Sequence, residues 1–272
     1  MGTVPNKELE QAARLIADAQ YVVALIGAGL SVESGIPPFR GPGGLWTRYG
    51  EPDMRGYQRF VASPKAWWEK QLFDPEPYRA ELNQALERAR PNPGHYALAE
   101  MERMGVLKHI ITQNVDNLHR LAGSKAIAEI HGNRTRLRCI GCGARFERSA
   151  FPINPRRLPP ECPECGGVVK GDGVMFGEPI PPDVLRVCEE QTLLCDCMLL
   201  VGTSGVVYPA AGFPSIARSK GAALVEVNPY DTPLSPLCDV RLRGPSGDIL
   251  PQVVEQVARL RQGPAEARKI PS

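Results

Sequence analysis

The stretch QYVVALIGAGLS, residues 20–31, decides the fold that this sequence predicts. Residues 20–26 form a short apolar run rich in β-branched side chains, which is typical of a parallel strand buried on both faces. Gly27 and Gly29 follow at its carboxyl end, where glycines allow backbone N–H groups to approach a pyrophosphate. The third glycine of the dinucleotide fingerprint is absent, because Val32 occupies its place. By itself, the pattern fits a plain strand-to-helix turn as well as a nucleotide site.

Short apolar runs of the same kind recur along the chain and alternate with helical patterns. This alternation predicts an α/β fold, a Rossmann-like parallel sheet flanked by helices. The further strands are expected at 108–112, 126–130, 197–201 and 222–227, and the helices at 7–19, 93–104, 209–219 and 249–261.

Two long segments interrupt the alternation. Residues 41–91 hold all three tryptophans and indicate a helical insertion, whereas residues 134–176 are dense in Cys, Gly, Pro and Arg. Long connections with little apolar content are usually functional or stapled by a metal. We therefore expect a Rossmann-like domain built from residues 1–40, 92–133 and 177–262, a helical insertion at 41–91, a small zinc-binding module at 134–176 and a polar tail at 263–272.

Composition and charge exclude several classes of protein. The chain has 272 residues, of which 43% are hydrophobic and 23% charged, and a net charge of 32 − 30 = +2, so no overall field favours nucleic acid or a membrane surface. No apolar stretch is long enough to span a bilayer. The first residues carry Glu8 and Glu10 without a basic segment leading into an apolar core, which argues against a secretory signal. We expect a cytoplasmic monomer.

Four of the eight cysteines form two C-x-x-C pairs, Cys139/Cys142 and Cys162/Cys165, separated by nineteen residues. This spacing is typical of two knuckles that together complete a tetrahedron of thiolates around Zn²⁺. A thioredoxin-like redox pair is the alternative, and the flanking glycines and the small apolar content argue for metal. Because no His or carboxylate offers an open position, the predicted zinc is structural.

Motifs spread over most of the chain resemble the signature of sirtuins of the prokaryotic type, which are NAD-dependent protein-lysine deacylases. The resemblance rests on the run from Gly27 to Gly41 (GAGLSVESGIPPFRG), on TQNVDNLH at 112–119, His131-Gly132, the two cysteine pairs, FGE at 176–178, GTS at 202–204 and Val227-Asn228. The order of these motifs is also that of the family.

The resemblance implies NAD⁺ bound at the carboxyl edge of the sheet. A diphosphate cradle, a nicotinamide site and an adenosine site would be formed along the chain in that order. The implied cofactor-binding residues are Gly27, Ala28, Gly29, Ser31, Phe39, Arg40, Gln113, Asn114, Val115, Asp116, Gly202, Thr203, Ser204, Asn228 and Ser246. Each of these could otherwise be a turn or cap residue.

The resemblance also implies that the acyl group, acetyl for this chain, moves from lysine to the ribose of NAD⁺. The products are free lysine, nicotinamide and 2′-O-acyl-ADP-ribose. His131 is the expected general base and Asn114 its catalytic neighbour, since a neutral imidazole can deprotonate a ribose hydroxyl. An acyl-lysine protein or peptide would contact Val174, Phe176, Gly177, Glu178 and Val206.

Two positions bear on the acyl group. The sirtuin branch that removes succinyl and malonyl groups carries Tyr-x-x-Arg where the simplest alignment gives this chain Gln71 and Asp74, and Asp74 would repel a second carboxylate. Tyr78-Arg79, a few residues further on, is the alternative match. The family also usually shows Pro and Val at the positions of Gly171 and Gly173, which leaves this loop less stiff by sequence.

Two other functions remain open. ADP-ribosyl transfer or NAD hydrolysis would use the same nucleotide site with another acceptor. A zinc-ribbon module that binds nucleic acid is suggested by the arginines around the knuckles, but stacking aromatics are few there and the nucleotide motifs would go unexplained.

Overall fold

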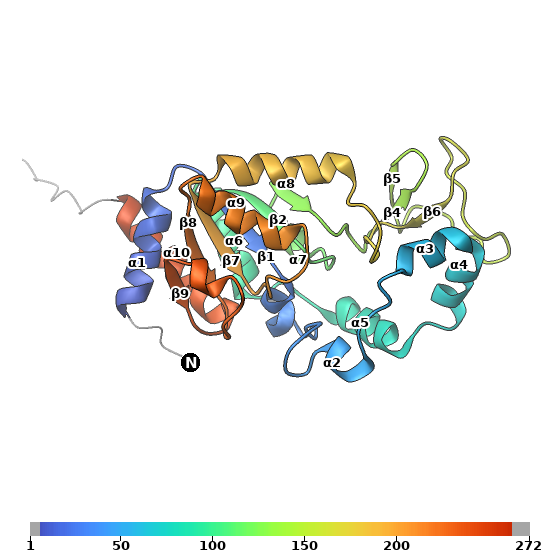
Figure 1. The fold of residues 1–272 in the computed structure, drawn as a ribbon, viewed down its shortest axis with the longest axis horizontal. Helices are drawn as coiled ribbons and strands as arrows, with labels where there is room; N and C mark the ends of the chain where they lie inside the picture. Colours follow the sequence, from blue (N-terminus) through green and yellow to red (C-terminus); the bar gives the residue numbers. More distant parts are fainter. Residues whose placement is uncertain (1–5, 263–272) are drawn as a thin grey trace, which may run out of the picture.

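A six-stranded parallel sheet forms the centre of the molecule, as Figure 1 shows for the computed structural model, which describes residues 6–262. Its strand order is β3-β2-β1-β7-β8-β9. The bounds are Val22–Ile26 for β1, Leu107–Thr112 for β2, Ile127–Glu129 for β3, Cys197–Val201 for β7, Ala223–Val227 for β8 and Val240–Leu242 for β9. The predicted parallel sheet flanked by helices is therefore confirmed.

Alternate residues of each central strand supply two separate cores. In β1, Val22, Ala24 and Ile26 pack on one face against α1, α6 and α10, whereas Val23 and Leu25 pack on the other against α8 and α9. All five β1 residues are fully buried, as expected for a strand covered on both faces. The flanking helices are α1 (Asn6–Asp18), α6 (Pro93–Arg103), α10 (Ser246–Gln262), α8 (Pro182–Leu194) and α9 (Phe213–Ser219).

The two long segments lie together at one end of the molecule (Figure 1). The first contains four short helices, and the second contains an antiparallel sheet of order β5-β4-β6. The bounds are Leu45–Tyr49 for α2, Gly56–Ala62 for α3, Pro64–Phe73 for α4, Pro77–Arg88 for α5, Arg136–Cys139 for β4, Arg145–Glu147 for β5 and Val169–Gly171 for β6. The exact boundaries between domain and insertions stay a prediction.

Three short elements complete the connections at the carboxyl edge of the large sheet: the 3₁₀ helix Ala28–Ser34 (η1), the helix Leu118–Leu121 (α7) and the 3₁₀ turn Ala210–Gly212 (η2) before α9. A further 3₁₀ turn, Ser235–Leu237 (η3), precedes β9. None of the helices in residues 6–262 has the length and apolar character that a membrane span requires. The predicted tail at 263–272 lies outside the described residues.

Candidate active site

The predicted nucleotide motifs meet at one edge of the sheet because the three strands they follow are neighbours. The loops after β1, β2 and β7 begin at Gly27, Gln113 and Gly202, and main-chain hydrogen bonds join them. Gly27 N donates to Val201 O at 2.9 Å, and Gln113 N donates to Ile26 O at 3.0 Å. A crevice outside the carboxyl ends of parallel strands is the general place for ligands in such sheets.

The first two glycines of the turn are explained by contact with the protein's own backbone. A Cβ added to Gly27 would lie 2.6 Å from Gly202 O, and one added to Gly29 would lie 2.6 Å from Gly202 Cα. The N–H groups of Gly27 and Gly29 donate to Val201 O and Gly202 O, both at 2.9 Å. Both N–H groups thus already have protein partners, contrary to the expectation that they approach a pyrophosphate.

Three polar side chains converge beside this turn. Ser31 Oγ donates to Asp116 Oδ2 at 2.7 Å, and Asn114 Nδ2 donates to Gly27 O at 3.0 Å and to Ser31 Oγ at 3.2 Å. Asp116 Oδ1 also accepts from Leu118 N at 2.9 Å. Burial raises the pKa of Asp116, and the hydrogen bonds from Ser31 and Leu118 oppose that shift. The cluster presents one buried carboxyl group and one amide, a suitable pair for a carboxamide ligand.

His131 lies two residues after β3, with its ring directed at the loop after β2. Its Nδ1 is 3.2 Å from Gln113 O. Because a carbonyl oxygen can only accept, Nδ1 carries the proton in this contact and Nε2 keeps its lone pair. Burial lowers the pKa of His131, and the Gln113 hydrogen bond raises it in part, so the ring is neutral at pH 7. This is the tautomer and charge that a general base requires.

The residues predicted to hold the adenosine half mostly bond to one another. Thr203 Oγ1 accepts from Gln113 Nε2 at 3.0 Å, and Asn228 Nδ2 donates to Thr203 O at 3.0 Å. Ser204 is exposed, whereas Ser246 is buried at the start of α10. The structure thus brings Gln113 and Asn228 to the Gly202–Ser204 turn, and their contacts with a cofactor stay a prediction.

A row of aromatic rings runs from the loop after η1 to the FGE motif. Phe39 lies 4.9 Å from Trp46, and Trp46 lies 5.6 Å from Phe176, measured between ring centroids. The Arg40 guanidinium lies over the Trp46 ring at 4.3 Å and forms an ion pair with Glu51 at 3.1 Å. Trp46 connects the two predicted motifs and was not among the expected site residues, although its place just after the first motif could have indicated it.

The predicted substrate residues occupy two loops. Val174 N donates to His131 O at 2.9 Å, and Tyr57 N donates to Phe176 O at 3.0 Å. Gly177 has φ +79°, and a Cβ there would lie 2.6 Å from the Gln58 side chain. The Glu178 carboxylate points inward to Arg138 and Lys170, so Glu178 can offer a peptide only its backbone. Val206 is exposed in the second loop.

The positions that bear on the acyl group lie on α4, α5 and the link between them. Gln71 lies on α4, and the exposed Asp74 follows that helix. On α5, Arg79 Nη1 donates to Gln71 Oε1 at 3.0 Å and its Nε donates to Tyr78 Oη at 2.9 Å. The structure thus places a tyrosine and an arginine next to Gln71, although they come from a different helix than the simple alignment suggests.

The four predicted zinc ligands come together. Their Sγ atoms all lie within 4.8 Å of one another, with Cys139–Cys165 at 3.5 Å and Cys142–Cys162 at 3.7 Å. Zn–S bonds of about 2.3 Å give a tetrahedron with S–S edges of about 3.8 Å, so the geometry fits the ion. Gly141 N and Gly167 N donate to Cys139 Sγ and Cys165 Sγ at 3.3 and 3.4 Å.

The ligand set defines what a zinc ion could do here. The cluster consists of four cysteines without a His or carboxylate, and such a closed set leaves no position for water or substrate. Burial raises the pKa of each of the other four thiols, so none of them is a thiolate at neutral pH: to about 11 for Cys195 and to about 12 for Cys188, Cys197 and Cys238. A redox role for the C-x-x-C pairs is disfavoured by the four-thiolate geometry.

Solved structures share this architecture over nearly the whole chain. A mutant Sir2 homologue in complex with ADP-ribose superimposes with a TM-score of 0.80 at 40% identity, covering 94% of this chain and 99% of that one. A Sir2 homologue in complex with NAD gives 0.77 at 41% identity, covering 93% and 94%. A Sir2 protein bound to a myristoylated histone peptide gives 0.68 at 35% identity, covering 95% and 99%.

Sequence relatives agree. The NAD-dependent protein deacylase 2 of Pyrobaculum aerophilum is 43% identical over 247 residues, 91% of this chain and 95% of the relative. The NAD-dependent protein deacylase of Thermococcus kodakarensis is 42% identical over 253 residues, 92% and 95% of the two chains. Residues 27–209 match the Sir2 family, and that match includes the glycine turn, the cysteine pairs and His131. The chain belongs to the Sir2 family.

Proposed function

We propose that this chain is an NAD-dependent protein-lysine deacylase that yields free lysine, nicotinamide and 2′-O-acyl-ADP-ribose. Relatives of this name and neighbours that bind NAD, ADP-ribose and an acylated peptide support the proposal. The observation that carries it is His131, a neutral imidazole whose Nδ1 is fixed by Gln113 O and whose Nε2 keeps its lone pair at the sheet edge.

NAD⁺ supplies an ADP-ribosyl group, which exchanges nicotinamide for the acyl oxygen of the substrate lysine. Asp116 and Asn114 bind and orient the nicotinamide end from the floor of the site, where Ser31 holds both side chains. Phe39, whose ring packs at a tilt against Trp46, shields the reacting carbon from water. Gln113 fixes the His131 ring, and Nε2 of His131 would take a proton from a ribose hydroxyl so that its oxygen can bond to the acyl carbon. Water then adds to that carbon and lysine leaves as the free amine, while the acyl group stays on the ribose oxygen.

The peptide binds between the loops at 173–178 and 205–208, mainly through backbone groups. We propose an acetyl group as the preferred acyl group, because Asp74 would repel a second carboxylate and the Arg79 guanidinium is already held by Gln71 and Tyr78. Eight cysteines that form no disulfide within the described residues, four of them in the zinc-type cluster, support a reducing compartment such as the cytoplasm. The net charge of +2 supports a chain that works without nucleic acid, and we take the monomer as the working form.

A panel of matched acyl peptides with NAD⁺ tests the function. Wild type should convert acetyl-lysine peptide to free lysine and acyl-ADP-ribose, with lower kcat/KM on the succinyl peptide. Removing one general base typically costs about 10²- to 10⁴-fold, so His131→Ala should lose acyl transfer by that order while it keeps its zinc and its melting temperature. Free ADP-ribose or labelled protein as the main product would instead indicate NAD hydrolysis or ADP-ribosyl transfer.

A further inference from the structure

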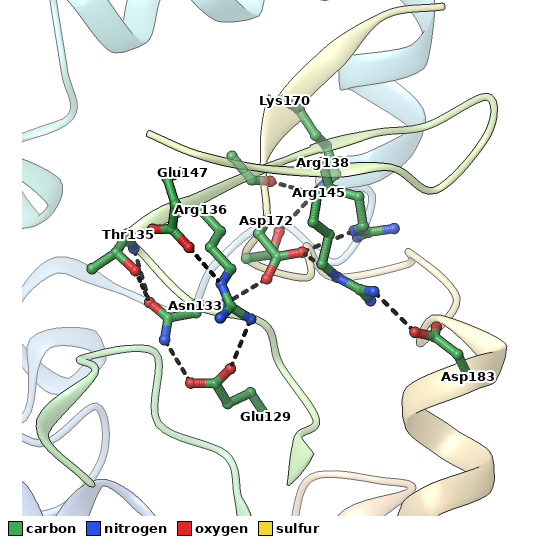
Figure 2. A network of polar contacts seen from close by, with 12 residues as sticks. Glu129, Asn133, Thr135, Arg136, Arg138, Arg145, Glu147, Lys170, Asp172 and Asp183 are labelled. Atoms are coloured by element: carbon green, nitrogen blue, oxygen red, sulfur yellow. Dashed lines mark hydrogen bonds and ion pairs between the residues drawn. The ribbon is translucent and has the colours of Figure 1, made fainter. Parts of the chain in front are cut away.

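A buried ion network joins the zinc-binding sheet to Asn133, two residues after His131; Figure 2 shows its charged members. Its central residue is Asp172, directly after β6 and only 4% exposed. Asp172 Oδ1 accepts from Arg138 Nε at 3.2 Å and from Arg145 Nε at 3.3 Å. Arg145 continues to Asp183 at the start of α8, with Nη1 to Oδ2 at 2.9 Å. The network therefore links the zinc-binding sheet to helix α8.

The second carboxylate oxygen of Asp172 holds the His131 turn. Asp172 Oδ2 accepts from Asn133 N at 2.9 Å, and Val174 N donates to His131 O at 2.9 Å. Between them, Gly132 has φ +80°, and a Cβ there would lie 2.3 Å from Asp172 O. The backbone directly after the His131 Cα, from the His131 carbonyl to Asn133 N, is thus fastened to residues 172–174, at a contact that no residue other than glycine permits at position 132.

The same cations fasten the loop that carries the predicted substrate residues. Arg138 Nη2 donates to Glu178 Oε1 at 2.6 Å, and Glu178 Oε2 accepts from Met175 N at 2.8 Å. Lys170, which is fully buried, lies 3.1 Å from Glu178 Oε2 through Nζ. The loop at 173–178 is therefore bound through Glu178 to Arg138 and Lys170 of the zinc-binding sheet.

Lys170 also compensates for the two glycines that replace the stiffer residues usual in the family. Its Nζ donates to Gly171 O at 2.8 Å and to Gly173 O at 2.7 Å. Two glycines flanking Asp172 would otherwise leave its backbone free to rotate. A buried ion pair adds little net stability, because its attraction is offset by the cost of desolvating both charges. We therefore assign the Lys170–Glu178 pair the role of fixing the geometry of this loop.

We propose that Asp172 is a positioning residue for acyl transfer, which acts by holding the His131 turn through Asn133 N while Arg138 and Arg145 fix its carboxylate. The proposal rests on the proposed function, in which nicotinamide leaves first and the proton transfer to His131 follows. A displaced His131 imidazole should therefore slow the proton transfer and acyl transfer, and leave the rate of nicotinamide release unchanged. Displacements of about 1 Å can cost about 100-fold in rate.

Two variants and two readouts test this at saturating peptide. Asp172→Asn keeps an oxygen for Asn133 N but loses the charge that fixes it, and Asp172→Ala loses both. Exchange of labelled nicotinamide into NAD⁺, which needs only the first stage, should stay within about twofold of wild type, whereas deacylation should fall by about 10- to 100-fold, more in Ala than in Asn. Zinc content and melting temperature report folding, and the Asn variant carries the test if the Ala variant does not fold.

Glu147→Gln is the matched control, because Glu147 is an exposed member of the same contacts that pairs with Arg136 and does not touch Asp172. It should leave both readouts unchanged. A parallel fall of exchange and deacylation in Asp172→Asn, or no fall in either, would overturn the proposal. His131→Ala separates the two failures. If His131→Ala deacylates at the wild-type rate, the proposed function fails. If His131→Ala loses deacylation but Asp172→Asn keeps it, only the positioning role of Asp172 fails.

Discussion

A tight backbone contact in the site lies between the turn after β1 and the turn after β7. A Cβ on Gly29 would meet Gly202 Cα at 2.6 Å and Gly202 O at 2.8 Å. Both are main-chain atoms, so neither can rotate aside as a side chain would. These residues hold the two loops of the nucleotide edge together whether or not a ligand is bound.

Gly29→Ala should therefore destabilise the fold itself. Overpacking a well-packed site typically costs about 1–3 kcal/mol, and we expect that loss in the free energy of unfolding measured with denaturant, in the absence of NAD⁺. Gly56→Ala is the matched control, since its Cβ would lie 3.7 Å from Phe176 O, an ordinary contact. Equal stability of the two variants would contradict the close-approach explanation.

The sequence motifs predicted which residues gather at the site, but not which contacts the individual side chains make there. Ser31, Asn114, Asp116 and His131 do meet, because each follows a predicted strand and the three strands β1, β2 and β3 are neighbours in the sheet. The inward turn of the Glu178 carboxylate could not be predicted, since it depends on Arg138 and Lys170, about forty and eight residues earlier. Nor did any pattern mark Asp172, whose partners are distant in sequence.

At the scale of elements, the five strands that follow apolar runs of the sequence, β1, β2, β3, β7 and β8, were predictable, whereas β9 and the three strands of the zinc-binding sheet were not. The β9 strand Val240–Leu242 has only three residues with Arg241 outward, and the strands of the zinc-binding sheet have three or four. Such segments gain strand structure only from their neighbours. The sequence of helix α8 does indicate a helix, although none was predicted there: Pro182 stands in its first turn and apolar residues follow at 184, 185 and 188.

Helices α6 and α7 meet through two buried histidines that make the fold sensitive to acid. The His95 and His119 rings lie 5.1 Å apart, and His95 Nε2 and both ring nitrogens of His119 have no partner within the described chain. Burial lowers the pKa of His95 to about 4 and that of His119 to about 3, from an ordinary value of 6.5. Both rings are neutral in the folded protein at every pH above these values.

A lowered pKa means that the unfolded chain takes up the proton first. The stability contributed by the neutral pair is complete above pH 6.5 and is lost as the pH falls from 6.5 toward 4, by about 1.4 kcal/mol per pH unit for each ring. His95→Gln removes one titrating ring but keeps an acceptor for Asn92 N at the start of α6. Its unfolding free energy should decline less steeply between pH 6.5 and 5 than that of wild type, and identical slopes would contradict the assignment.

At the scale of the whole molecule, the two segments predicted as separate insertions share one small core. Trp68 of α4 is 2% exposed and packs with Leu137, Val169 and the ligand Cys139 of the zinc-binding sheet. Its Nε1 donates to Val169 O at 2.9 Å. The sequence could place the tryptophans in one segment and the cysteines in another, but not the contact between them, because about a hundred residues separate its partners.

A three-stranded sheet of this size is too small to be stable alone, so the metal, the sheet and helix α4 should open as a unit. Trp68→Phe keeps most of the ring but leaves Val169 O without its donor, which costs about 1–3 kcal/mol. Release of zinc to a chelator should then be faster by a factor on the order of 5–150. Trp67→Phe changes the neighbouring, half-buried ring and makes the matched control, with release expected near the wild-type rate. Equal release from Trp68→Phe and wild type would mean that the zinc-binding sheet holds its metal independently of the helical segment.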